Sequence, residues 1–308
     1  MSGKTLQEQA CDLLPEYSEM CHIFTRKFVI TSKSQSCISN YLRQISKLII
    51  HYKCNPLDLT IDRLEEYLYW LKLHESPSAS SFKHLVYGLR HFYRIFKQED
   101  LILSLPSIAN RKSLPVVLSL SEVHRLLMAP RILKHRVLLG VIYDCGLRIS
   151  ELRNLTIGDV DMDRQMVHIR ESKCKKDRYV PISSMAIRGI KRYMALVKPQ
   201  HYLFNGAVLG KPISTPAIRE IMRNALRRSG ISKKACVHTL RHSYATHLLE
   251  SGLNIMTVKE QLGHTNFETT LMYLHIAQVA PKIGYSPLSV LYHYHHQPVD
   301  DDNWQYLD

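Results

Sequence analysis

Residues 238–249 read HTLRHSYATHLL and place three histidines and one arginine within a few positions of one another. The apolar residues of this stretch and its surroundings predict one helix. Imidazole and guanidinium groups that gather on one helix are typical of two kinds of site, a metal centre and a phosphate-binding site. The spacing of the residues and the rest of the sequence decide between the two.

The histidines of this helix have an unfavourable pattern for a metal centre. His238 and His242 form an i, i+4 pair, but His247 follows only after a five-residue step, and the H-E-x-x-H motif is absent. Arg241 lies between the histidines and would repel a cation. His238 and Arg241 are three residues apart and share a helical face, where both can bind the oxygens of one phosphate. The stretch therefore favours phosphate, and no metal ligand is assigned.

Three further residues extend this interpretation. Arg148 follows Gly146-Leu147 at a helix break, His264 follows Gly263 at another, and Tyr273 lies nine residues beyond His264. Arginine and histidine bind phosphate, and a tyrosine hydroxyl can attack it. Each residue alone has an ordinary explanation, because surface arginines and half-buried tyrosines are common. Their joint occurrence favours a phosphate-binding site with a hydroxyl that could attack the phosphate over these separate explanations.

The charge of the chain predicts a polyanionic partner. The chain has 41 Lys and Arg against 27 Asp and Glu, a net charge of +14. Residues 118–283 hold 26 basic and 12 acidic residues, whereas residues 284–308 hold four acidic residues and no basic one. No apolar stretch approaches the roughly 18 residues of a membrane span, so nucleic acid is favoured over a membrane. A basic soluble protein without such a partner is the alternative.

The cysteines indicate a reducing compartment. There are seven, an odd number, and no C-x-x-C motif occurs. The N-terminus also lacks the apolar region of a signal peptide. Reduced thiols and a cytoplasmic location are therefore expected.

The pattern of apolar residues predicts a mainly α-helical protein with one small antiparallel sheet. The expected parts are an extension (1–24) that packs loosely or docks elsewhere, a helical domain (25–104), a linker (105–117), a larger domain (118–283) and a tail (284–308). Apolar repeats predict helices over 38–52, 61–71, 82–96, 132–144, 184–197, 214–229, 238–251, 254–262 and 267–277. The first begins near Ser36, the second follows Thr60 as its N-cap, and the third begins among the serines at 77–81. A further helix is expected to begin at the capping-box pattern of Ser119 and Glu122. Strands are expected around Val167, Ile169, Tyr179, Val180 and Ile182.

The third expected helix, at 82–96, has an apolar face and an opposite basic face. Lys83, Arg90 and Arg94 lie on the basic face, and Arg111 and Lys112 follow in the linker. Basic side chains of this kind suit the phosphates of a DNA backbone, so all five are candidate DNA-binding residues. A solvated face without a ligand explains the helix equally well.

Three separated motifs resemble those of the tyrosine recombinases, the phage integrase family. They are CGLRISEL (145–152), HTLRHSYATHLL (238–249) and LGHTNFETTLMYLH (262–275), and their order and spacing match over residues 118–280. The helical region 25–104 resembles the family's core-binding domain, and residues 118–283 its catalytic domain. The resemblance implies catalytic roles for Arg148, His238, Arg241 and His264, with Tyr273 as the nucleophile.

A catalytic lysine is also implied by the resemblance. In this family it lies on a hairpin turn before a V-P segment, and Lys173 of ESKCKKDRYVPI (171–182) occupies that place. The chain departs from the family at Ser172 and Cys174, where glycines are frequent. Lys175 and Lys176 are neighbours of Lys173 and further DNA-binding candidates.

The chemistry of phosphodiester cleavage fits these assignments. A tyrosine hydroxyl has a pKa of about 10 and is ionised in roughly one molecule in a thousand at pH 7, so attack needs a proton acceptor. His238 is the expected acceptor, whereas His242 and His247 are expected to serve packing or capping. Arginines stabilise the charge on the non-bridging oxygens, and Lys173 protonates the departing 5′ oxygen. No metal, ATP or other cofactor is expected.

The resemblance implies a site-specific recombinase or integrase that cleaves and rejoins duplex DNA through a 3′-phosphotyrosine. It also implies a homotetramer on two DNA sites. The alternatives are a type IB topoisomerase, a DNA-binding protein without catalysis, and a metal-binding regulator. The acidic tail is expected to contact a neighbouring protomer, with an unattached tail as the alternative.

Overall fold

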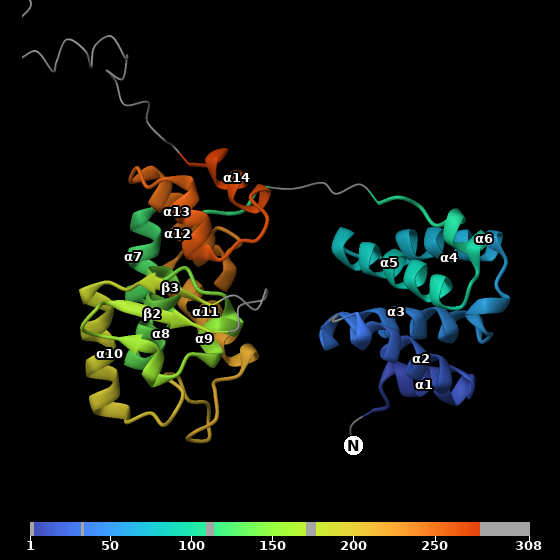
Figure 1. The fold of residues 1–308 in the computed structure, drawn as a ribbon, viewed down its shortest axis with the longest axis horizontal. Coiled ribbons are helices and arrows are strands. Elements are labelled where there is room, and N and C mark those ends of the chain that lie inside the picture. Colours follow the sequence, from blue (N-terminus) through green and yellow to red (C-terminus); the bar gives the residue numbers. More distant parts are fainter. Residues whose placement is uncertain (1–2, 32–33, 109–113, 171–176, 278–308) are drawn as a thin grey trace, which may run out of the picture. The chain divides into compact units, whose positions relative to one another are not determined.

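The computed structural model describes residues 3–31, 34–108, 114–170 and 177–277. The chain divides into two compact units, Met1–Arg111 and Lys112–Asp308 (Figure 1). Each unit has its own hydrophobic core. The division falls inside the expected linker. The candidates Arg111, Lys112, Lys173, Lys175 and Lys176, and the tail 284–308, lie outside the described residues.

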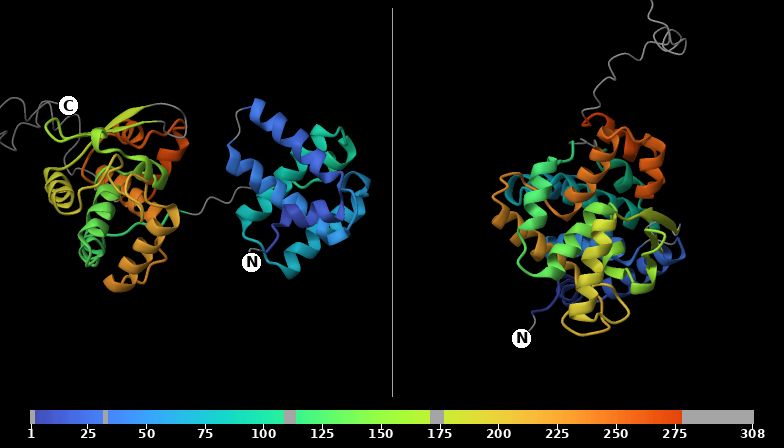
Figure 2. Two further views of the ribbon diagram at one scale, coloured as in Figure 1. Left: turned by 90° about the horizontal axis from the view of Figure 1, so that it is seen from below. Right: turned by 90° about the vertical axis from the view of Figure 1, so that its left-hand side faces the viewer.

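The N-terminal unit is a bundle of helices, coloured from blue to blue-green in Figures 1 and 2. The expected starts of two of its helices are confirmed, because Thr60 and Ser78 accept hydrogen bonds from backbone N–H groups of the first turn. The helices are α1 (Leu6–Leu13), α2 (Tyr17–Ile30), α3 (Gln35–Tyr52), η1 (Pro56–Asp58), α4 (Ile61–His74), α5 (Ala79–Ile95) and α6 (Glu99–Ser104).

Residues 3–24 belong to this bundle, which corrects the expectation of a loosely packed extension. Helix α1 contacts α3, and Ala10, Tyr17 and Phe24 are fully buried in the core of the bundle. The hydroxyl of Tyr17 donates a hydrogen bond to the carbonyl of Leu42 at 3.0 Å. The two helices are separated near Pro15, and α1 is too short to display a clear helical repeat in the sequence.

The second unit combines helices with one small sheet, which confirms the predicted fold class (Figure 1). Strands β1 (Val160–Asp161), β2 (Met166–Ile169) and β3 (Arg178–Pro181) are antiparallel and lie in that order, with Val167 opposite Val180. The helices are α7 (Leu120–Met128), α8 (Leu133–Asp144), α9 (Ile149–Asn154), η2 (Ile157–Asp159), α10 (Ser184–Val197), α11 (Thr215–Ser229), α12 (Val237–Glu250), α13 (Ile255–Leu262) and α14 (Glu268–Leu274).

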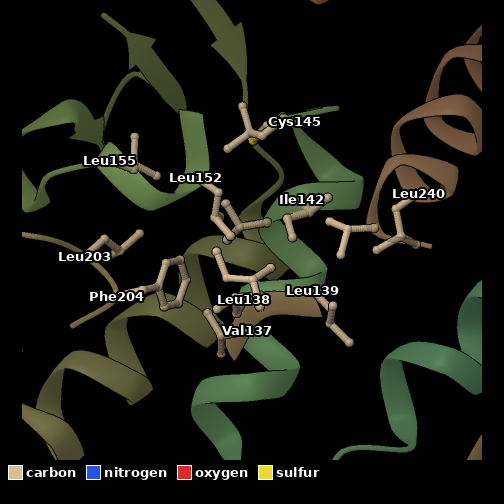
Figure 3. Packing of buried hydrophobic residues seen from close by; sticks show 14 of the residues in the cluster. Val137, Leu138, Leu139, Ile142, Cys145, Leu152, Leu155, Leu203, Phe204 and Leu240 are labelled. Atoms are coloured by element: carbon tan, nitrogen blue, oxygen red, sulfur yellow. The ribbon is translucent and has the colours of Figure 1, made fainter. Parts of the chain in front are cut away.

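Helix α8 lies at the centre of this unit. It packs against α10 and α12, and its residues Leu138, Leu139 and Ile142 are fully buried (Figure 3). A helix with apolar residues on several faces is one that other elements cover from several sides. Helices therefore pack against α8 from more than one side, and the turn at its C-terminal end leads directly to Arg148.

Candidate active site

Five of the predicted site residues come from neighbouring elements of the second unit. Arg148 precedes α9, His238 and Arg241 lie on α12, His264 follows α13, and Tyr273 lies on α14. Helix α12 contacts both α13 and α14, and Figure 1 shows these helices grouped together. The contacts described below connect the five residues in one site.

Two glycines shape the backbone on either side of this site. Gly146 has a φ of +58°, and a β-carbon there would lie 2.4 Å from the Tyr244 ring. Gly263 has a φ of +62°, and a β-carbon there would lie 3.0 Å from the Arg178 guanidinium. Only glycine fits both the left-handed backbone and the close neighbour at these positions. The chain therefore turns sharply just before Arg148 and just before His264.

Arg241 is fully buried and joins these two turns. Its guanidinium donates one hydrogen bond to the carbonyl of Gly146 (2.7 Å) and another to the carbonyl of Leu262 (2.5 Å). Burial, followed by the charge of Arg148, lowers the pKa of Arg241 to about 10. The side chain thus keeps its positive charge at neutral pH and is held in one orientation.

A buried carboxylate, Glu151, organises three arginines. It accepts hydrogen bonds from the side chain of Arg148 (2.7 Å) and from both terminal nitrogens of Arg178 (3.0 and 2.9 Å). Arg241 lies 3.7 Å from the same carboxylate. Arg178 also donates to the carbonyl of Gln261 at 2.7 Å, which joins β3 to the end of α13. The carboxylate therefore holds cationic groups from β3, α9 and α12 around one point.

Glu151 remains ionised in this environment. Burial alone would raise its pKa, but hydrogen bonds and charge from Arg178, the N–H of Arg148 and the charge of Arg241 together lower the pKa to about 2. Three guanidinium groups face one carboxylate, so an excess of positive charge remains. Such an excess suits the binding of a phosphodiester.

The sequence analysis assigned no role to Glu151 or Arg178. Glu151 lies three residues after Arg148 in the quoted motif, and Arg178 precedes the V-P segment. A carboxylate one helical turn from a candidate arginine was a usable signal for Glu151. Arg178 had no comparable signal, because its partners at positions 151 and 261 are distant in the sequence.

The hydroxyl of Tyr273 is buried against an imidazole. Tyr273 is 1% exposed, and its hydroxyl lies 2.9 Å from Nδ1 of His242. Burial raises the pKa of Tyr273, and the charges of Arg241 and Arg148 oppose this rise. The interpretation of His242 as a packing or capping residue is therefore corrected, because its ring lies at the candidate nucleophile.

The other two candidate histidines lie beside this pair. The ring of His238 packs edge-on against His242, with centroids 4.5 Å apart. The ring of His264 is nearly parallel to that of Tyr273 at 6.3 Å, and its Nδ1 lies 2.9 Å from the hydroxyl of Thr270. Burial and the neighbouring arginines lower the pKa of both histidines, that of His264 to about 3. Both are therefore uncharged at neutral pH.

His247 has a partner outside the site. Its Nδ1 lies 2.8 Å from the hydroxyl of Tyr143, which connects α12 to α8. This contact agrees with the packing role expected from the sequence.

The candidate DNA-binding residues of α5 are placed differently from one another. Arg94 is exposed, whereas Arg90 donates hydrogen bonds to the carbonyls of Leu105 (3.1 Å) and Pro106 (3.3 Å). Lys83 and Arg90 both lie over the ring of Tyr87, at 5.4 and 5.7 Å from its centroid. The guanidinium of Arg90 is thus engaged within its own unit, and Arg94 is the freer basic group.

A second basic face was missed by the sequence analysis. It is the exposed side of α11 (Thr215–Ser229), where arginines recur at two four-residue steps and a further arginine follows directly. The signal was present in the run RNALRRSGISKK at 223–234. The exposed arginines of this face are Arg219, Arg223, Arg227 and Arg228.

Two negative observations apply to the described residues alone. They contain no group of three or more His, Cys, Asp or Glu side chains placed to hold a metal ion. None of their helices is long and apolar enough to cross a membrane.

Comparison with known protein families matches most of each unit. Residues 117–279 match the model of the phage integrase family, and residues 21–103 match the phage integrase N-terminal SAM-like domain. The second match begins within α2 and ends within α6.

Individual proteins agree with the family models. A tyrosine recombinase of Pseudothermotoga lettingae is 32% identical over 244 residues, which are 76% of this chain and 84% of the relative. Tyrosine recombinase XerD of Staphylococcus saprophyticus is 31% identical over 82% of this chain and 92% of the relative.

Solved structures share the fold at lower sequence identity. The Tn1549 transposon integrase in complex with a circular intermediate DNA has a TM-score of 0.65 at 16% identity, over 82% of this chain and 94% of that one. The XerH site-specific recombinase bound to a palindromic difH substrate has a TM-score of 0.65 at 19% identity, over 78% and 76%. The family models and the relatives together show that this chain belongs to the phage integrase family, the tyrosine recombinases.

Proposed function

We propose that this protein is a site-specific recombinase that cleaves and rejoins duplex DNA through a covalent 3′-phosphotyrosine at Tyr273. The observation that carries the proposal is the position of the Tyr273 hydroxyl, which is 2.9 Å from an imidazole nitrogen on the helix that also holds Arg241. A hydroxyl beside a neutral proton acceptor and close to cationic groups is suited to attack a phosphodiester.

The proposed reaction transfers one phosphate from a sugar oxygen to tyrosine. The Tyr273 oxygen forms a bond to phosphorus while the bond to the 5′ oxygen of DNA breaks. Arg148 and Arg241 would bind the non-bridging oxygens, where negative charge increases in the transition state, together with His238 and His264. Lys173 would protonate the departing 5′ oxygen. Because the phosphotyrosine ester conserves the bond, the reverse reaction joins DNA without ATP, and guanidinium groups supply the charge that a divalent metal supplies elsewhere.

The partner in this proposal is double-stranded DNA, and four protomers would act on two DNA sites as a homotetramer. The net charge of residues 118–283 and the basic face of α11 support binding to DNA. The tetramer is inferred from the family. A cytoplasmic location is part of the proposal, because an odd number of cysteines without a C-x-x-C motif suits a reducing compartment.

The experiment that tests the function traps the covalent intermediate. Purified protein is mixed with nicked duplexes of randomised sequence, so that cleavage near the nick releases a short fragment and leaves the adduct unable to religate. Adducts are separated on a denaturing gel, and their DNA is sequenced to obtain a preferred substrate. We expect adducts from the unchanged protein and none from Tyr273→Phe, which loses one oxygen and little volume.

Two further experiments distinguish the proposed recombinase from a metal-dependent enzyme and from a topoisomerase. EDTA should leave adduct formation unchanged, and inhibition by EDTA would favour a metal-dependent reaction. Two duplexes that carry the preferred sequence should exchange strands, whereas relaxation of supercoiled DNA without exchange would favour a topoisomerase. An adduct that persists in Tyr273→Phe, or no adduct from the unchanged protein, would contradict the proposal.

A further inference from the structure

Helix α12 presents two histidines near Tyr273, and only one of them contacts the hydroxyl. Nδ1 of His242 lies 2.9 Å from that oxygen, a normal hydrogen-bond distance. The ring of His238 meets the ring of His242 edge-on at 4.5 Å and lies one helical turn earlier. His242 therefore contacts both His238 and Tyr273. We infer that His242 is the catalytic residue that accepts the proton of Tyr273, the role that the sequence had indicated for His238.

The surroundings of His242 keep its ring in the form that this role requires. The titratable and charged groups that face it are His238 and Arg241 from its own helix and Tyr273 from α14. Burial, followed by the positive surroundings, lowers the pKa of His242 to about 4. The ring is therefore neutral at pH 7. In the tautomer that carries its proton on Nε2, the lone pair of Nδ1 accepts the hydrogen bond of the phenol.

The same surroundings explain why the proton moves only when DNA is bound. An imidazolium beside Arg241 is disfavoured in the free protein. A phosphodiester in the site adds negative charge, which increases as Tyr273 attacks, and this charge stabilises a protonated His242. Proton transfer is thus coupled to the step in which it is needed.

The proton balance of the step is complete. As the Tyr273 oxygen bonds to phosphorus, its proton passes to Nδ1 of His242, and the 5′ oxygen leaves with a proton from Lys173. In religation His242 returns the proton to the phenolate oxygen as the tyrosine leaves, and Lys173 recovers its own. No oxidant, metal or further reactant is required.

The test compares variants of two histidines that make the same kind of contact. His242→Gln and His242→Phe remove the proton acceptor, and only Gln can still accept a hydrogen bond from the phenol. His247→Gln is the matched control, because His247 lies on the same helix and pairs with the hydroxyl of Tyr143 at 2.8 Å, outside the site. Thermal unfolding of each variant establishes that it is folded.

The measurement is the single-turnover rate of adduct formation on the preferred nicked duplex from pH 6 to 9. We expect both His242 variants to lose on the order of 10²-fold in rate at pH 7, the lower range for general acid–base catalysis. Their rates should rise with pH, because hydroxide can then remove the phenol proton. A duplex with sulfur in place of the bridging 5′ oxygen has a leaving group that needs no proton, and it should not restore these variants. His247→Gln should keep the unchanged rate.

The inference rests on the proposed function, and the two can fail separately. Adducts formed by Tyr273→Phe would overturn the proposed function. Loss of adducts in Tyr273→Phe together with an unchanged rate in His242→Phe would overturn only the inference. An unchanged rate in His242→Gln would reduce His242 to a hydrogen-bonding role. If recovery at high pH occurs in His238→Gln and not in His242→Gln, the acceptor is His238.

Discussion

Glu151 is the residue on which the arrangement of the three arginines depends. Its side chain is 3% exposed and is bound by Arg148 and Arg178, with Arg241 nearby. Replacing it by glutamine would leave buried guanidinium groups without their counter-charge. Loss of one partner of a buried ion pair costs about 3–5 kcal/mol, so the Glu151→Gln variant should be destabilised by a similar amount at pH 7.

The pH dependence of this loss has a definite sign. The pKa of Glu151 is lowered from 4.5 to about 2 in the folded protein, so its contribution to stability is present above the unfolded value and is lost as pH falls towards the folded value. The difference in the free energy of unfolding between the unchanged protein and Glu151→Gln should therefore decrease between about pH 5 and 2. Urea unfolding at several pH values measures it. A difference that stays constant with pH would mean that the carboxylate is not the stabilising group.

The site residues that could be predicted from the sequence are those that belong to a short, recognisable motif. Arg148, His238, Arg241, His264 and Tyr273 were found in this way, and the structure groups them. Their catalytic roles remain predictions. The contact of His242 with Tyr273 was not predicted, because helical spacing cannot tell which of two histidines, four residues apart, faces a tyrosine on another helix. That distinction depends on how α14 packs against α12.

At the scale of elements, helix boundaries followed from caps and apolar repeats. The capping box at Ser119 and Glu122 and the stop at Gly263 both occur where the sequence indicated. Helix α1 was not predicted, because its eight residues contain only about two helical turns and show no clear apolar repeat. Whether a basic helix face remains free also required the structure, since Arg90 bonds to carbonyls that follow α6.

The exposed arginines of α11 make a prediction at this scale. Each phosphate that a protein neutralises contributes about −0.9 to the slope of log K against log salt concentration. Replacing Arg223 and Arg227 by alanine should therefore make the slope shallower by about two units. Arg90→Ala, by contrast, should change the slope little, because its guanidinium is held by the backbone carbonyls of Leu105 and Pro106. The partners of Arg223 and Arg227 are the surface side chains of Glu220 and Asn224 on the same helix, which a DNA phosphate can replace. Fluorescence anisotropy with the preferred duplex, between 50 and 300 mM salt as an approximate range, measures both.

The salt dependence of these variants also decides which of the two basic faces, that of α5 or that of α11, binds DNA. If Arg90→Ala flattens the slope and the α11 double variant does not, the basic face of α5 contacts DNA and that of α11 does not. Arg94→Ala is a useful third variant because Arg94 is exposed on the same helix as Arg90.

At the scale of the whole molecule, the charge is divided between parts of the chain. Residues 118–283 have a net charge of +14, and residues 284–308 have a net charge of −4 with Tyr292, Tyr294 and Trp304 among them. The tail lies outside the described residues, so its contact with a neighbouring protomer remains a prediction from the sequence. Opposite charge supports such a contact, and aromatic residues are typical anchors at interfaces.

Truncation after Lys282 tests this prediction. Removal of the tail takes away acidic residues and possible anchors but no candidate catalytic residue, so one protomer should bind the preferred duplex as before or slightly more tightly. Complexes that contain several protomers should become weaker, and strand exchange should decrease while adduct formation on a nicked duplex continues. Native gels and sedimentation of the protein–DNA complexes separate these effects. Assembly and strand exchange at unchanged levels would mean that the tail takes no part in joining protomers, and the contacts between protomers would then have to arise from residues 1–282.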